Sequence, residues 1–211
     1  MPEFRALLRG YHRFRSERYE AERRRWERLA TGQAPPLMII GCCDSRVDPA
    51  TIFDTEPGQA FILRNVANLV PPYEIGGGLH GVSAALEFGV AKLQVRHIVV
   101  MGHGACGGIA AALGGYGDPD RGFIDPWIGL LDGAVEQVRA AAPEDPQRAL
   151  EFEGVKTSLA NLRSFPFVRD REQAGELKLH GCYFAIADGR LWELDEGTGR
   201  FLKIEEQLVP E

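Results

Sequence analysis

Two uninterrupted apolar runs, at residues 37–40 and 98–101, constrain the fold of this chain more than any other feature, and each ends at a glycine. Short runs of this kind are typical of strands buried in a parallel sheet. Further strands are expected at 61–63, 177–187 and 191–194, with helices over 82–93 and twice between 127 and 162. The alternation predicts an α/β fold, with a mostly parallel central sheet flanked by helices.

The first 32 residues form a predicted helical arm that precedes an α/β core at 33–211, and we interpret the whole of 1–211 as one domain. Residues 1–30 carry nine Arg and five Glu, so the arm is near +4 and the remainder near −10. A basic arm raises the alternative of nucleic-acid binding. Interleaved Arg and Glu are more typical of a solvated helix face, so we expect no nucleic-acid partner. The helically spaced apolar side chains need another surface to cover them, within the domain or across a dimer; they are Phe4, Leu7, Leu8, Tyr11 and Phe14.

Composition indicates a reducing compartment. No run reaches the roughly 18 apolar residues that span a bilayer, and the chain starts without an apolar signal region. We therefore expect a cytoplasmic protein with no membrane partner. The chain has four cysteines, and thiols kept reduced in the cytosol favour metal binding or catalysis over disulfides.

Two motifs follow the apolar runs directly: Cys42-Cys43-Asp44-Ser45-Arg46 and His103-Gly104-Ala105-Cys106. Because ligands of open parallel sheets bind beyond the carboxyl ends of the strands, the two motifs are expected to meet in one crevice. Two thiolates and one imidazole supply three zinc ligands and leave the fourth tetrahedral position for water, as in catalytic zinc sites. We predict one Zn²⁺ per chain, held by Cys42, His103 and Cys106.

Alternate residues of an extended segment share one face, so Cys42 is the expected ligand and Cys43 is expected to point away. Asp44 and Arg46 share the face of Cys42. A carboxylate beside the metal can accept a hydrogen bond from zinc-bound hydroxide, while an arginine keeps that carboxylate ionised. Cys106 is predicted to begin a helix, whose N-terminus favours a thiolate. Glycines at 102, 104, 107 and 108 are expected to let the backbone approach the metal.

These motifs resemble those of the β-class carbonic anhydrases, and the resemblance is strong over residues 33–113, including Arg64-Asn65-Val66-Ala67-Asn68. It implies reversible hydration of carbon dioxide to bicarbonate by zinc-bound hydroxide, with Asp44 and Arg46 as catalytic residues. It also implies a lyase that acts as a homodimer, with a dimer of dimers as the larger assembly, and an N-terminal arm docked on the partner subunit.

The flanking residues resemble the plant-type members of that family. The resemblance assigns the substrate pocket to Gln33, Phe61, Val66, Phe88 and Gly107, with the glutamine and the aromatic wall supplied by the neighbouring subunit. Members inhibited by bicarbonate carry a tryptophan and a tyrosine where this chain has Ile39 and Phe184, which argues against that inhibitory site. Phe88 and Lys92 replace a tyrosine and a histidine of many plant-type enzymes, so the proton-transfer route is unassigned.

Two other functions stay open at this point. Some relatives hydrolyse carbon disulfide or carbonyl sulfide on the same fold, and the ligand set does not distinguish these substrates. A noncatalytic zinc or thiol-redox protein is the alternative of a different class, since Cys42 and Cys43 are adjacent thiols.

Overall fold

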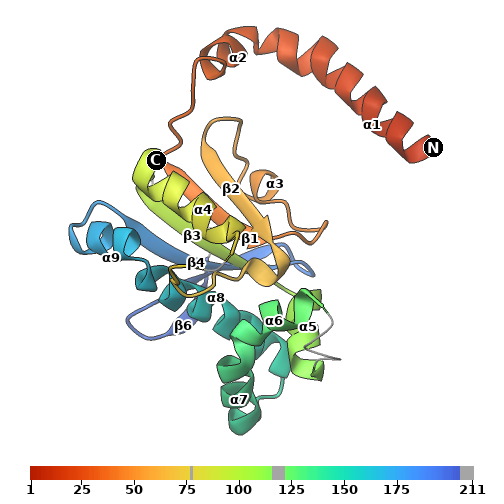
Figure 1. Cartoon of the computed structure of the whole chain (residues 1–211). Helices are drawn as coiled ribbons and strands as arrows, with labels where there is room; N and C mark the ends of the chain where they lie inside the picture. Colours follow the sequence, from red (N-terminus) through yellow and green to blue (C-terminus); the bar gives the residue numbers. More distant parts are fainter. Residues whose placement is uncertain (77, 116–121, 205–211) are drawn as a thin grey trace. The chain divides into compact units, whose positions relative to one another are not determined.

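In the computed structural model, residues 1–76, 78–115 and 122–204 are described, and within them six strands form one sheet in the order β2-β1-β3-β4-β5-β6 (Figure 1). The strands are β1 (Leu37–Cys42), β2 (Ala60–Asn65), β3 (His97–His103), β4 (Lys178–Ala185), β5 (Arg190–Asp195) and β6 (Arg200–Lys203). The first four are parallel, and β5 and β6 are antiparallel additions at one edge. The predicted α/β fold with a mostly parallel sheet is confirmed.

The chain divides into two compact units, Met1–Ala34 and Pro35–Glu211, and each is described by itself. The first unit contains α1 (Pro2–Arg13), a π-helical turn (Phe14–Tyr19) and α2 (Arg23–Leu29). The predicted arm helix is therefore present. The helices of the second unit are α3 (Pro49–Ile52), α4 (Gly81–Glu87), α5 (Gly107–Gly114), α6 (Ile124–Ile128), α7 (Asp132–Ala141), α8 (Pro146–Ser164) and α9 (Pro166–Gln173), with short 3-10 or π turns at Val66–Asn68, Phe88–Lys92 and Gly129–Leu131.

Helices α4 and α8 pack against the same face of the sheet, on which Met38 and Val100 are fully buried. A side chain at Gly89, just after α4, would come within 3.0 Å of the Met38 sulfur, and one at Gly102 would come within 2.7 Å of Val155 of α8. The second of these close approaches explains why β3 has a glycine at position 102, directly before His103. Helix α8 therefore lies against the face of the sheet, near the carboxyl ends of β3 and β4.

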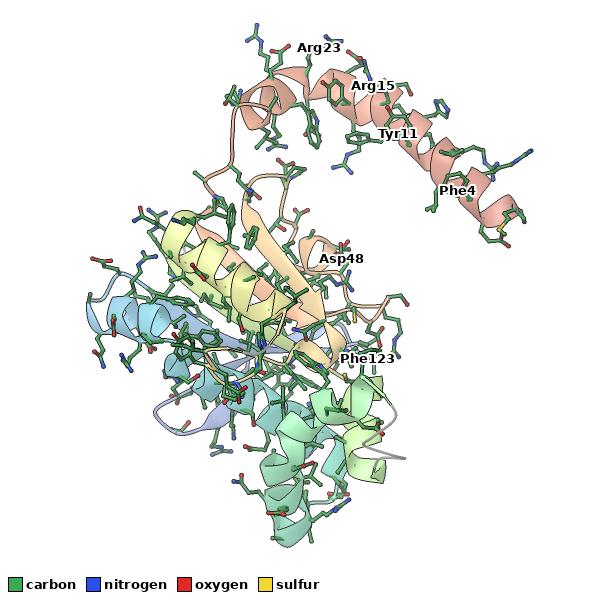
Figure 2. The ribbon with its side chains drawn as sticks, viewed as in Figure 1. Phe4, Tyr11, Arg15, Arg23, Asp48 and Phe123 are labelled. Atoms are coloured by element: carbon green, nitrogen blue, oxygen red, sulfur yellow. The ribbon has the colours of Figure 1, made fainter. Side chains whose placement is uncertain are left out.

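The arm buries none of the residues in its helices within its own unit. Phe4 and Tyr11 of α1 are 60% and 58% exposed, and Figure 2 labels both. Phe14, Tyr19 and Trp26 pack on one another, with the ring centroids of Phe14 and Trp26 5.4 Å apart and those of Tyr19 and Trp26 5.8 Å apart. The apolar stripe predicted from the spacing is present, and the described arm does not cover it.

The structure confirms the later strands expected from the sequence and adds elements that the sequence did not predict. The predicted strand at 177–187 is β4, and the Asp188-Gly189 turn leads into β5, with Gly189 in the left-handed region at φ 68°. The spacing gave no signal for β6 or α9. Residues 116–121 lie outside the described residues, and α6 begins at Ile124, before the region in which two helices were expected. Among the described residues, no helix has the length and apolarity that crossing a membrane requires.

Candidate metal centre

Cys42, His103 and Cys106 converge at the carboxyl ends of β1 and β3. The two strands are parallel neighbours, with Gly41 opposite Met101, so the residues that follow them reach the same edge of the sheet. The three potential ligand atoms all lie within 4.8 Å of one another, and all three residues are buried. Cys43 is exposed and all four cysteines are free thiols. The alternation argument thus selected the cysteine that joins the cluster.

The His103 ring is prepared to bind a metal through one nitrogen. Its Nδ1 lies 2.9 Å from the carbonyl oxygen of Gly104. Since a carbonyl only accepts, Nδ1 carries the proton and Nε2 presents its lone pair. That Nε2 is buried and has no hydrogen-bond partner within the described structure. An unsatisfied buried nitrogen beside two thiols is explained by a bound cation, and two sulfurs with one imidazole are a donor set that suits Zn²⁺.

Electrostatics favour a thiolate in this cluster. Cys106, together with the neighbouring His103 ring and two backbone amides, holds the pKa of Cys42 well below its ordinary value. The Cys42 thiolate and burial then raise the pKa of Cys106. Burial disfavours protonation of His103, but Cys42 and the Gly104 carbonyl outweigh it and raise the pKa of that ring. Without a cation, therefore, only one thiol ionises readily, and metal binding must displace the second proton.

Asp44 is held beside the cluster by Arg46. The guanidinium donates from Nε to Oδ1 at 2.9 Å and from Nη2 to Oδ2 at 2.6 Å, and the Arg46 amide also donates to Oδ1. These bonds hold the pKa of the Asp44 carboxyl far below its usual range. Arg46 Nη2 also donates to the carbonyl of Ala105 at 3.0 Å, which ties the two motifs together. Asp44 Oδ2 lies 4.0 Å from His103 Nε2, so an ionised carboxylate borders the face that the ring offers to a metal.

Arg64 fixes the segment that follows β1. Its Nε donates to the carbonyl of Cys42 at 2.9 Å, and its Nη2 donates to the carbonyls of Asp44 and Val47 at 2.7 and 3.2 Å. Its Nη1 also approaches Asp48, which caps α3 and is labelled in Figure 2. The guanidinium is thus committed to the backbone of the metal-binding segment. The sequence indicated Arg64 only as part of a segment that resembles the family, and did not reveal this role.

Three of the four glycines in or next to the second motif lie in close contact with neighbouring elements. A Cβ at Gly104 would lie 3.0 Å from the Tyr183 hydroxyl, and one at Gly108 would lie 2.9 Å from Val66. Gly102 faces α8, as described above. A Cβ at Gly107 would meet nothing within 4 Å. Three of the four glycines therefore allow close contacts with α8, β4 and the turn after β2, and our expectation that all four admit the backbone to the metal stays a prediction.

The predicted substrate residues fall into two groups. Val66 packs against the cluster that contains Cys42 and Cys106, and Gly107 follows Cys106 at the start of α5. Phe61 lies opposite Met38, four residues before Cys42, which corresponds to roughly 13 Å along the strand at about 3.3 Å per residue. Phe88 packs on Phe61, with ring centroids 5.8 Å apart, and is 46% exposed.

The structure therefore does not bring the aromatic pair to the metal ligands of its own chain. Gln33 belongs to the first unit, between α2 and β1. The roles assigned to these residues by resemblance stay predictions.

Sequence reasoning missed three residues around Cys106: Gln147 and Glu151 of α8 and Tyr183 of β4. The amide of Cys106 donates to Glu151 Oε1 at 3.0 Å, and the Tyr183 hydroxyl donates to Glu151 Oε2 at 2.9 Å. Only one signal was present in the sequence: Glu151 falls on the apolar face of a helix, between the buried Leu150 and Val155. That signal does not reveal the contact with Cys106, because 45 residues separate the two.

Comparisons with known proteins agree with this arrangement. The carbonic anhydrase family profile matches residues 37–191. Beta carbonic anhydrase 6, mitochondrial, of Arabidopsis thaliana is 38% identical over 192 residues, which are 86% of this chain and 65% of the relative. Beta carbonic anhydrase 3 of the same plant is 36% identical over 198 residues, covering 90% of this chain and 76% of the relative. The chain thus spans about two thirds to three quarters of the length of these relatives.

Solved structures show the same fold. The β-carbonic anhydrase CcaA superposes with a TM-score of 0.89 at 29% identity, covering 96% of this chain and all of that one. A β-carbonic anhydrase of Sordaria macrospora gives a TM-score of 0.80 at 32% identity, with 92% and 98% covered. The profile match spans more than half of the chain and includes both ligand motifs. The chain belongs to the β-class carbonic anhydrase family.

Proposed function

We propose that this chain catalyses the reversible hydration of carbon dioxide to bicarbonate and a proton, with one Zn²⁺ bound by Cys42, His103 and Cys106. The observation that carries the proposal is the ionised carboxylate beside three converging ligands: Asp44 Oδ2 lies 4.0 Å from the unpartnered Nε2 of His103. A closed structural zinc site has four protein ligands and needs no such group. Zinc, when bound, acidifies a water molecule and so supplies the nucleophile for carbon dioxide.

The chain's own residues have distinct tasks in this reaction. Asp44 accepts a hydrogen bond from the nucleophile and orients it, because both of its oxygens are fixed by Arg46. Arg46 keeps Asp44 ionised and prevents it from turning onto the metal as a fourth ligand. Val66, packed against the ligand cluster, provides an apolar wall that suits a linear, uncharged substrate.

Stopped-flow measurement of carbon dioxide hydration by the zinc-loaded protein across pH tests the proposal. Asp44→Asn should lower kcat by about 10²-fold or more while zinc content stays at one per chain. Asp170→Asn, which changes an exposed carboxylate of α9, is the control and should leave kcat unchanged. A zinc-loaded protein without hydration activity at alkaline pH contradicts the proposal, and sulfide release from carbonyl sulfide by that protein would favour the sulfur-analogue hydrolase.

We further propose that the functional unit is a homodimer, with a dimer of dimers as the larger assembly, in which the partner subunit completes the substrate pocket. Two observations support this. The apolar side chains of α1 are exposed, and Phe61, on which Phe88 packs, lies far along β2 from the metal ligands of its own chain. Among the solved relatives, those from Sordaria macrospora are described as tetrameric.

Mixing two defective chains tests whether Gln33 acts across the subunit boundary. Gln33→Ala retains the metal ligands, and Cys42→Ser retains Gln33. If the partner supplies Gln33, mixed dimers regain one complete pocket and activity rises above that of either parent after subunit exchange. If activity stays at the average of the two parents, Gln33 acts within its own chain or not at all. Sedimentation velocity of the unmixed protein gives the oligomeric state.

We propose that the active site is of the plant type and is not inhibited by bicarbonate. Two contacts support this. Arg46 pairs with Asp44, and Arg64 donates to three backbone carbonyls, so neither guanidinium is free to bind a bicarbonate ion. Ile39 is buried and offers no hydrogen bond. Initial rates at increasing bicarbonate should show only product competition, and cooperative loss of activity would contradict the proposal.

We propose a cytoplasmic location, which the four free thiols support since such thiols persist in reducing compartments. The name of one relative specifies mitochondria, so the comparison gives no single compartment. Fractionation of cells that produce the protein tests this proposal, and enrichment in an organelle would contradict it.

A further inference from the structure

Glu151 is a buried carboxylate for which the proposed reaction has no use. It lies on α8 and is 3% exposed, between Leu150 and Val155, which are both fully buried. A buried carboxylate requires several hydrogen-bond donors to offset its lost hydration. The identity of those donors indicates what the residue does.

Three donors surround the carboxylate, and one of them belongs to a metal ligand. Oε1 accepts from the Cys106 amide at 3.0 Å and from Gln147 Nε2 at 2.8 Å. Oε2 accepts from the Tyr183 hydroxyl at 2.9 Å. Gln147 Nε2 also donates to the Cys106 carbonyl at 3.1 Å. Helix α8 therefore holds both the N–H and the C=O of the residue that supplies the second thiolate.

The local backbone explains why Cys106 needs such support. Cys106 is the N-cap of α5, and Ala105 before it adopts a left-handed conformation at φ 55°, which is unfavourable for a residue with a Cβ. Without Glu151, the buried Cys106 amide would lose the acceptor that it has in this structure. The carboxylate thus stabilises a turn that the local sequence does not favour.

We propose that Glu151 is a positioning residue that fixes the Cys106 thiolate for zinc, with Tyr183 and Gln147 orienting its carboxylate. The inference rests on the proposed zinc site. The chain of contacts runs from β4 through Tyr183 to α8 and then to the first turn of α5. Its parts are rigid: the Tyr183 ring packs edge-on against Phe152 at 4.8 Å, and its hydroxyl abuts Gly104.

Zinc affinity, measured by competition with a chromogenic chelator, tests the proposal without reference to catalysis. Glu151→Met removes every acceptor at similar length and should raise the zinc dissociation constant by about 10- to 100-fold. Glu151→Gln keeps an oxygen for the Cys106 amide and should recover most of that loss. Glu153→Met is the matched control, because Glu153 lies on the same helix but pairs with Lys156.

A rise of less than threefold for Glu151→Met, or an equal rise for Glu153→Met, overturns the proposal. Urea unfolding of the metal-free proteins distinguishes a general loss of stability from a specific loss of zinc affinity. A purely structural role for Glu151 would lower the stability and leave the zinc affinity intact. If Glu151→Met does not fold, Tyr183→Phe retains the ring and removes only the hydroxyl. Its zinc affinity should fall several-fold, and an unchanged affinity overturns the proposal.

Absorption of the cobalt(II)-substituted variants gives a second readout, because thiolate-to-metal bands report the geometry at sulfur. Glu151→Met should shift these bands and Glu153→Met should not, and unshifted bands for Glu151→Met overturn the proposal. Failure of the wild-type protein to hydrate carbon dioxide would contradict the proposed function but leave these affinity ratios unaffected.

Discussion

The two segments that supply the metal ligands are held by groups of opposite charge. Residues 42–48 leave β1 as irregular chain, and the Arg64 cation binds their carbonyl oxygens. Residues 103–107 lead into α5, and the Glu151 anion binds the Cys106 amide. An irregular segment exposes carbonyls that need donors, whereas the start of a helix exposes N–H groups that need acceptors. The comparison shows that backbone polarity determines which charged residue supports each ligand.

Loss of a ligand from either segment is the largest expected effect. Cys42→Ser and Cys106→Ser should each reduce bound zinc from one per chain to below about a tenth after dialysis, because both thiolates contribute to affinity. Carbon dioxide hydration should be lost with the metal. Zinc is measured by atomic emission against protein concentration. Cys43→Ser is the control, since Cys43 is exposed, and a comparable zinc loss in Cys43→Ser would contradict the ligand assignment.

The second-largest effect is expected when the contact between the two ligand segments is broken. Arg46 joins Asp44 to the Ala105 carbonyl, so Arg46→Ala frees Asp44 to turn onto the metal. We expect kcat/KM to fall by about 10²-fold or more with zinc still bound at one per chain. Arg46→Lys should recover only part of the rate, because an ammonium does not form the two parallel hydrogen bonds of a guanidinium. Full activity of Arg46→Ala would exclude this role for the pair.

The metal ligands and the Asp44–Arg46 pair could be predicted from the sequence, because the residues that decide them are close together in the chain. Each ligand motif directly follows an apolar run, and parallel strands bring such ends together. The alternation of side chains was sufficient to separate Cys42 from Cys43. Asp44 and Arg46 are two residues apart, so their ion pair also lies within the range of local reasoning.

The supporting residues could not be predicted because their contacts are remote in sequence. Arg64 reaches Cys42 across 22 positions and Glu151 reaches Cys106 across 45. The segment that contains Arg64 resembles the family but does not reveal the partners of that side chain, and helical spacing gives Glu151 only a place on an apolar face. The placement of Phe61 also required the strand register, because a strand's position in the sequence does not fix which residue of its neighbour it pairs with.

Replacing Arg64 tests whether a cation supports the ligand segment that follows β1. Arg64→Met leaves the carbonyls of Cys42, Asp44 and Val47 without their donor. Urea unfolding should show a loss of about 1–3 kcal/mol, the typical cost of unsatisfied buried polar groups. Zinc should also bind roughly tenfold more weakly. Arg169→Met, which alters an exposed cation of α9, should change neither quantity. If Arg64→Met weakens folding without weakening zinc binding, the residue supports the core and not the ligand segment.

The smallest effect concerns the other end of β3, which begins at His97 and ends at the ligand His103. His97 Nδ1 lies 3.0 Å from His180 Nε2, so one of these nitrogens donates a hydrogen bond and the other accepts it. Burial, followed by the repulsion of His180, Lys178 and Arg96, lowers the pKa of His97. The unfolded chain therefore takes up this proton at a higher pH than the folded chain, and stability falls as pH drops below about 6.5.

His97→Gln should remove this dependence and make the unfolding free energy of the metal-free protein flatter between pH 7 and pH 5. The slope can change by at most one proton, or about 1.4 kcal/mol per pH unit. Metal-free protein is used so that acid release of zinc at His103 does not contribute. An unchanged slope would show that the His97 ring titrates alike in both states. A changed slope would establish that the histidine at the start of β3 is proton-sensitive, because burial and neighbouring groups lower its pKa, whereas at the end of the same strand Cys42 and the Gly104 carbonyl outweigh burial and raise the pKa of His103.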